Sequence, residues 1–184
     1  MQPRYSNLNQ ALHWITAACM LAILPLAWVM TNAAEKTPHL SSMYNWHKTL
    51  GTIVLFVTIF RLVWRFIDKP PPYAQHLAKW DKGLSHATLW LLYAVLLWMP
   101  TTGFIMAESE GHPTKIFDLI PTPQLWPVNK ALADQFGYLH ALGQWAVYGL
   151  ILLHVAGVAF HLIWGRDGVT GRMLPPYATE PPAV

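Results

Sequence analysis

The sequence predicts an all-α integral membrane protein, a four-helix bundle that forms a single domain over residues 1–184. Charged side chains make up only 11% of the chain and hydrophobic ones 54%, whereas a soluble domain carries about 25% charged residues. The apolar residues gather into four stretches, each near the length of about 20 residues that a helix needs to cross a bilayer. The chain also has ten tryptophans, and tryptophan is enriched at membrane interfaces.

The four predicted spans are separated by more polar segments. They cover residues 8–31, 46–67, 83–107 and 136–165. The second span is the weakest, because Arg61 and Arg65 lie in its last turns. Arginine tolerates that position, since its long side chain can reach the lipid headgroups. A cleaved leader is a second interpretation of residues 1–31, but its apolar region would exceed the usual length of about 7–15 residues.

Lysine and arginine predict the orientation of the spans, because these residues are enriched in cytoplasmic loops. Eight of the twelve lie on the side of the two termini and the 67–82 loop: Arg4, Arg61, Arg65, Lys69, Lys79, Lys82, Arg166 and Arg172. The other four are lysines of the opposite side. We therefore expect cytoplasmic termini, and we expect the long 108–135 connection to form a structured cap on the outer surface.

Composition also excludes some classes of site and partner. The single cysteine, Cys19, rules out an intramolecular disulfide and any zinc or iron–sulfur site built from cysteines. The net charge of +3 comes without a basic cluster, so no nucleic-acid partner is predicted. The partner that the composition does predict is the lipid bilayer.

Three histidines lie in the fourth span, within a stretch that has no charged residue. His140, His154 and His161 are spaced by fourteen and then seven residues. At about 100° per residue, these spacings return to within about 40° and about 20° of the starting direction. The imidazoles would therefore form one stripe on the helix, and ionisable residues inside a span are functional candidates.

Two further histidines match this stripe in depth. His47 opens the second span on the outer side, near the depth of His140, and His13 lies near the inner start of the first span, where it could face His154. Two histidines on different helices suit a metal held between axial imidazoles. Zinc fits poorly because it prefers four protein ligands, whereas a haem brings four nitrogens of its own. The chain has no Cys-x-x-Cys-His motif, so we expect two haems b, about 21 Å apart by helix rise.

Short motifs around these histidines recur in one known family. They are RYSNLNQALHW with His13, NWHKTLG with His47, RLVWRF at the end of the second span, GLSH at 83–86, MPTTGF in the third span, the histidine stripe, and the closing GRMLP. Along nearly its whole length the chain resembles the bacterial cytochrome b561 family. The resemblance implies a multi-pass protein of the bacterial inner membrane, with His13 and His154 on the iron of the inner haem and His47 and His140 on that of the outer haem.

Two histidines remain on the inner side of the predicted bundle. His86 or His161 could replace His13 as a ligand, but a position beside the inner haem is the better interpretation, because a histidine there can donate a hydrogen bond or a proton to a quinone. The candidate quinone pocket combines inner-side cations and histidines: Arg61, Arg65, Lys79, Lys82, His86 and His161. The remaining histidines, His39, His76 and His112, are expected at the surface.

The resemblance implies an enzyme, a superoxide:ubiquinone oxidoreductase that oxidises superoxide at the periplasmic face. A haem with two histidine ligands has no open position, so the expected chemistry is outer-sphere electron transfer. Lys48, Lys115 and Lys130 could steer a small anion toward the outer haem. The outer loops carry five acidic residues against four lysines, so such steering would be local.

Two other functional classes stay open at this stage. The haems could carry electrons the other way, from a quinol to or from a periplasmic redox partner or dehydrogenase, as in related subunits that anchor hydrogenases. A protein redox partner is therefore allowed but not required. In a third interpretation the protein is a colourless scaffold or transporter whose histidines merely bridge helices.

Overall fold

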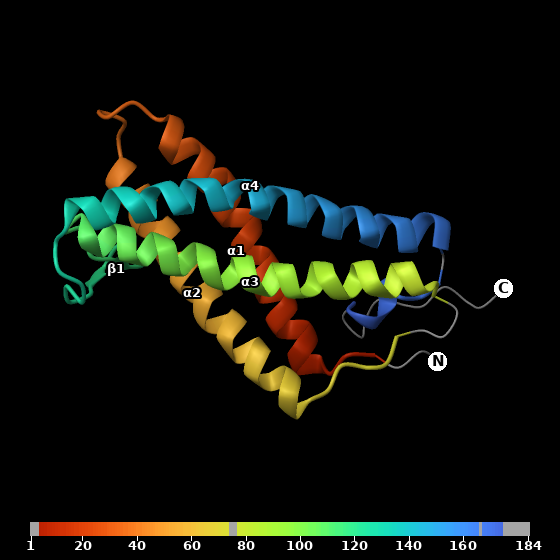
Figure 1. Ribbon diagram of the computed structural model, residues 1–184. Coiled ribbons are helices and arrows are strands. Elements are labelled where there is room, and N and C mark those ends of the chain that lie inside the picture. Colours follow the sequence, from red (N-terminus) through yellow and green to blue (C-terminus); the bar gives the residue numbers. More distant parts are fainter. Residues whose placement is uncertain (1–3, 74–76, 166, 175–184) are drawn as a thin grey trace.

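Four long helices dominate the computed structural model, which describes residues 4–73, 77–165 and 167–174 (Figure 1). They are α1 (Asn7–Asn32), α2 (Leu40–Ile67), α3 (Lys79–Ser109) and α4 (Lys130–Phe160), and α4 continues into a π-helical turn, η1 (His161–Gly165). Each helix is long and apolar enough to cross a membrane. The predicted all-α architecture with four spans is confirmed. Arg166 and His76 lie outside the described residues.

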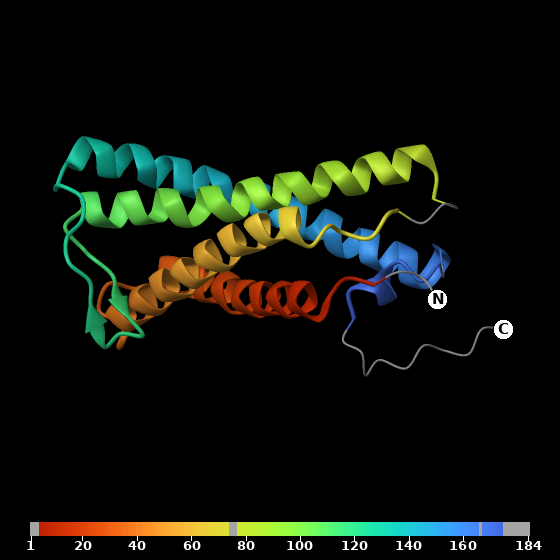
Figure 2. The same ribbon diagram turned by 90° about the horizontal axis from the view of Figure 1, so that it is seen from below.

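The helices pack as two crossing layers. α1 packs against α2 and α3 against α4, and α2 also contacts α3 between the two pairs. Figure 2 shows the two helical hairpins one above the other, with their axes crossing. We call one end of the bundle the termini end; it holds both described chain ends and the α2–α3 connection. The opposite end, the cap end, holds the α1–α2 connection and residues 110–129.

Three of the helices begin earlier than the apolar pattern predicts. α2 begins at Leu40 rather than 46, α3 at Lys79 rather than 83, and α4 at Lys130 rather than 136. Lys130, Asp134 and Gln135 make the start of α4 less apolar than the rest of the helix. The Asn129 side chain caps this end by accepting a hydrogen bond from the Leu132 amide at 3.1 Å. Hydropathy marks the part of a helix that suits the bilayer, whereas capping decides where the helix starts.

The outer faces of the helices are apolar and their contact faces partly polar. Leu21, Phe56 and Leu152 lie in mid-helix and are 76%, 66% and 71% exposed, which suits contact with lipid. Thr49, in contrast, is fully buried. Its hydroxyl donates a hydrogen bond to the Asn45 carbonyl at 2.8 Å and accepts one from the Phe117 amide at 3.0 Å. This small polar side chain therefore lies between α2 and the segment that follows α3.

A short hairpin ties the long third connection to α2. Strands β1 (Lys115–Ile116) and β2 (Ile120–Pro121) pair antiparallel, and Asp118 in their turn has a positive φ of 59°. The Asp118 carboxylate accepts hydrogen bonds from Ser42 and, at 2.6 Å, from Asn45. The connection therefore forms an ordered cap over the end of the bundle, as expected.

The C-terminal segment folds back over the termini end. It contains a 3-10 helix, η2 (Thr170–Arg172), and the Arg172 carbonyl accepts a hydrogen bond from the Tyr5 amide at 3.1 Å. The buried Arg172 guanidinium donates to the Pro72 carbonyl at 2.8 Å. Arg172, near the end of the described chain, thus makes hydrogen bonds to both the N-terminal segment and the α2–α3 connection.

Candidate functional site

One pair of histidines meets near the cap end. His47 of α2 and His140 of α4 have ring centroids 6.2 Å apart, with an angle of 82° between the ring planes. Nδ1 of His140 lies 2.9 Å from the Met99 carbonyl of α3. A carbonyl can only accept, so Nδ1 carries the proton and Nε2 keeps a lone pair that can bind a metal.

α3 makes room for the His140 ring at a glycine. A Cβ added to Gly103 would lie 2.9 Å from Cε1 of His140, closer than real Cβ contacts allow. The hydroxyl of Thr102, the preceding residue, lies 3.2 Å from Nδ1 of the same ring. The MPTTGF segment of α3 therefore determines both the position and the orientation of this histidine.

A second pair of histidines meets deeper in the bundle, toward the termini end. His13 of α1 and His154 of α4 also have ring centroids 6.2 Å apart, with an interplanar angle of 68°. His154 follows His140 by fourteen residues on one helix, or about 21 Å along its axis. Each pair thus joins one histidine of the first hairpin to one histidine of α4.

The chain resembles known proteins along most of its length. A family model described as prokaryotic cytochrome b561 matches residues 4–176. The chain belongs to the prokaryotic cytochrome b561 family. Cytochrome b561 homolog 2 of Escherichia coli (strain K12) is 25% identical over 177 residues, which cover 93% of this chain and 91% of that protein. The function of the chain is therefore transmembrane electron transfer in a multi-pass, haem-binding cytochrome.

Both histidine pairs of this cytochrome b561 protein fit a haem. Ring centroids 6.2 Å apart leave room for one metal ion between the two imidazoles of each pair, because metal–nitrogen bonds are about 2 Å long. Among the described residues, no three His, Cys, Asp or Glu side chains lie together as ligands for a bare metal ion. The donor sets therefore suit a cofactor that brings its own in-plane nitrogens.

His161 has a different environment from the other histidines of the stripe. It is buried, its Nδ1 lies 2.6 Å from the Asp167 carboxylate, and its Nε2 lies 3.5 Å from the carboxylate of Asp81 on α3. Both ring nitrogens thus face an acid. His161 stands apart from the His13 and His154 pair, and it can pass or hold a proton between two carboxylates.

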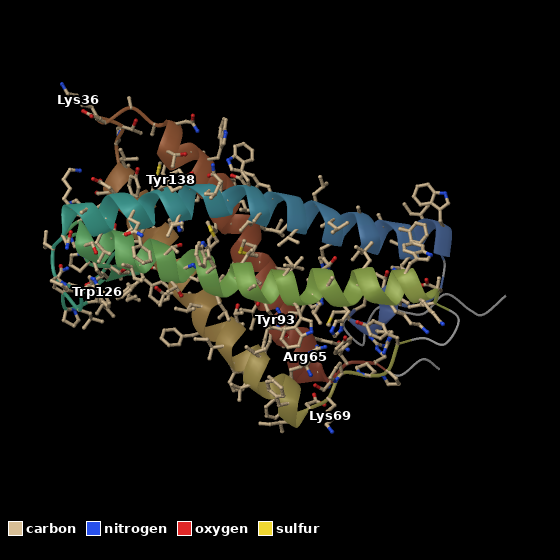
Figure 3. The ribbon with its side chains drawn as sticks, viewed as in Figure 1. Lys36, Arg65, Lys69, Tyr93, Trp126 and Tyr138 are labelled. Carbon is tan, nitrogen blue, oxygen red and sulfur yellow. The ribbon has the colours of Figure 1, made fainter. Side chains whose placement is uncertain are left out.

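The other inner-side candidates lie where α2 meets α3. The guanidinium of Arg61 lies 5.7 Å from the centre of the Tyr93 ring, and that of Arg65 lies 5.8 Å from the centre of the Trp90 ring. The Trp90 indole donates a hydrogen bond to Nε2 of His86 at 3.1 Å. Figure 3 labels Tyr93 and Arg65 in this region. Two candidates remain at the start of α3, the exposed Lys79 and the half-buried Lys82.

The three lysines predicted to steer superoxide have different surroundings. Lys48, next to His47, donates through Nζ to the carbonyls of His112 and Pro113 at 3.1 and 3.2 Å. Lys115 is exposed on β1. Nζ of Lys130 lies 3.0 Å from the Asp134 carboxylate one turn along α4. The structure therefore holds Lys48 against the cap and pairs Lys130 with an acid.

Sequence reasoning missed the acids that organise the two ends. Glu108 is only 1% exposed, and its Oε2 accepts hydrogen bonds from the amides of Leu125 and Trp126 at 2.6 and 3.2 Å. It fixes the second half of the cap, whose Trp126 is labelled in Figure 3. The first acid after an apolar run was the available signal for Glu108. Asp81 and Asp167, which flank His161, had no comparable signal.

Proposed function

We propose that the protein oxidises superoxide at the cap end and reduces ubiquinone at the termini end, with two haems b between them. The observation that carries this proposal is the pair of facing histidine sets at two depths of one bundle. The α4 members of the two pairs, His140 and His154, are fourteen residues apart. This spacing is a rise of about 21 Å, which extends across most of an apolar core of about 30 Å.

When bound, the two haem irons supply the one-electron redox couples that the polypeptide lacks. In the overall reaction two superoxide ions each lose an electron and become dioxygen, and one ubiquinone takes two electrons and two protons to become ubiquinol. His47 with His140 would hold the outer haem, and His13 with His154 would hold the inner haem. Superoxide then needs only to come close to the outer site.

Local charge at the cap end supports an anionic electron donor. Lys48 directly follows His47, and its ammonium group is held at the cap by two carbonyls. Lys48 interacts electrostatically with Glu108 and Glu110, and more weakly with Lys115. Lys48, next to His47, would attract a small anion locally, against the opposing charge of Glu108 and Glu110. Lys130 is a weaker candidate, because Asp134 neutralises it.

The termini end offers two groups of side chains for a quinone and its protons. One is the α2–α3 cluster of Arg61, Arg65 and His86, with Lys79 and Lys82 nearby at the start of α3. The other is His161 between Asp81 and Asp167. Cationic and imidazole donors suit quinone carbonyls, and a histidine held between two carboxylates suits delivery of protons taken from the adjacent aqueous side.

The test is an optical experiment on the oxidised protein in detergent. A superoxide generator should reduce the haems rapidly, superoxide dismutase should abolish that reduction, and an added ubiquinone analogue should reoxidise the haems. Reduction by a quinol with no response to superoxide would overturn the proposal. That result would instead favour a carrier that serves a periplasmic redox partner or dehydrogenase.

A further inference from the structure

Arg61 occupies a special position on α2. It follows His47 by fourteen residues, the same interval that separates His154 from His140 on α4. Fourteen residues return to within about 40° of the same helix face after a rise of about 21 Å. α2 therefore presents Arg61 at the depth of the inner pair, on nearly the face that presents His47 at the outer pair.

The contacts of Arg61 place its guanidinium among three helices. Nη1 lies 3.4 Å from the hydroxyl of Thr16 on α1, and the guanidinium carbon lies 5.7 Å from the ring centre of Tyr93 on α3. Thr16 and Tyr93 are both buried. Arg61 also lies close enough to His13 and His154 to interact with both electrostatically.

No carboxylate forms an ion pair with Arg61 in the part of the chain that the structure describes. The acids that the structure describes at the termini end bind other groups: Asp81 and Asp167 flank His161. Asp68 accepts hydrogen bonds from Asn9 and Ser6. A guanidinium within a membrane-spanning bundle is costly unless an anion balances it.

We propose that Arg61 pairs with a carboxylate of the inner haem, a propionate group, and raises the reduction potential of that haem. The inference rests on the proposed ligation of a haem by His13 and His154. The guanidinium fork matches a carboxylate in shape and charge. A fixed positive charge near the iron favours the reduced form, which carries one positive charge less than the oxidised form.

The test is an equilibrium redox titration of the purified holoprotein, read in the visible bands of both haems. At a fixed ambient potential, R61Q should lower the ratio of reduced to oxidised inner haem at least tenfold. For a one-electron couple, a tenfold change corresponds to a fall of about 59 mV in the reduction potential. The outer haem should not change. The matched control is R65Q, one turn along the same helix, which should change the ratio less than threefold. An H154F variant identifies the bands of the inner haem.

Resonance Raman bands of the propionate groups give an independent readout, and they should shift in R61Q but not in R65Q. Unchanged inner-haem potential and bands in R61Q, or equal shifts in both variants, would overturn the pairing. If R61Q loses the inner haem, the R61K variant is measured in its place. A retained haem whose propionate band is shifted from that of wild type supports the pairing, and an unshifted band overturns it. If the wild-type protein binds no haem, the proposed function itself is contradicted.

Discussion

At the scale of single residues, the outer histidine pair depends on side chains that are not themselves ligands. The Met99 carbonyl fixes the tautomer of His140 at 2.9 Å. Gly103 leaves the space that the ring occupies. Such supporting groups hold a metal ligand in the correct orientation before the metal binds, and replacing them commonly costs about 10–100-fold in affinity.

Replacing Gly103 with alanine should therefore weaken binding of the outer haem about 10–100-fold, because the new Cβ would lie 2.9 Å from Cε1 of His140. The haem-to-protein ratio of G103A should fall toward one, while the inner haem keeps its spectrum. G149A is the matched control, since nothing lies within 4 Å of a Cβ at that position of α4. Full retention of both haems in G103A would contradict the role given to this glycine.

At the scale of elements, the cap is fastened to α2 through one carboxylate. Hydrogen bonds from Ser42, and then from Asn45, lower the pKa of Asp118 below its ordinary value. The folded cap thus prefers the charged form of Asp118. This contribution to cap stability is complete above the pKa of a free aspartate, about 3.9, and is lost as the pH falls through the lower pKa of the folded cap.

Hydrogen exchange of the 115–121 amides should reveal this dependence. At pH 7, D118N should exchange several-fold faster than wild type, because asparagine lacks the charge but tolerates the positive φ. After correction for intrinsic rates, the difference should shrink once the pH falls below about 4. D134N, which removes an exposed carboxylate on α4, should leave cap exchange unchanged. If the difference in exchange rate between D118N and wild type stays constant down to pH 3, ionisation of Asp118 does not stabilise the cap.

At the scale of the whole molecule, the two ends of the bundle differ in charge. The termini end holds the C-terminal segment and the arginines of α2, and the cap end holds acids and lysines together. Figure 3 shows Lys36 at the cap end and Lys69 at the termini end. The excess of basic residues predicts that the termini end faces the cytoplasm.

Thiol labelling in intact spheroplasts checks this orientation. In a C19A background, K36C should react with a membrane-impermeant maleimide from outside, whereas K69C should react only after permeabilisation. Both lysines are exposed, so differences in burial do not confuse the comparison. Labelling of K69C alone in intact spheroplasts would reverse the orientation and exchange the faces assigned to superoxide and ubiquinone.

Much of this molecule could be predicted because its helices are regular. In a regular helix, the number of residues between two positions gives their separation along the axis and the angle between their side chains. Four apolar stretches predicted the spans, and spacings of fourteen and seven predicted the stripe of His140, His154 and His161. The surroundings of His161 could not be predicted. Its two carboxylates come from the start of α3 and from a turn after η1, so their meeting depends on how the chain folds back. The carbonyls that bind Lys48 belong to the cap, so these contacts could not be predicted from the sequence either.

The division of the histidines between the two hairpins has a consequence for biosynthesis. His13 and His47 leave the ribosome early, whereas His140 and His154 both belong to α4, the last of the four long helices that the structure describes. On the proposed ligation, each haem needs one histidine of α4, so neither haem could be held by both of its histidines until α4 has been translated. Nascent chains that stop before α4 would carry only one of the two histidines proposed for each haem.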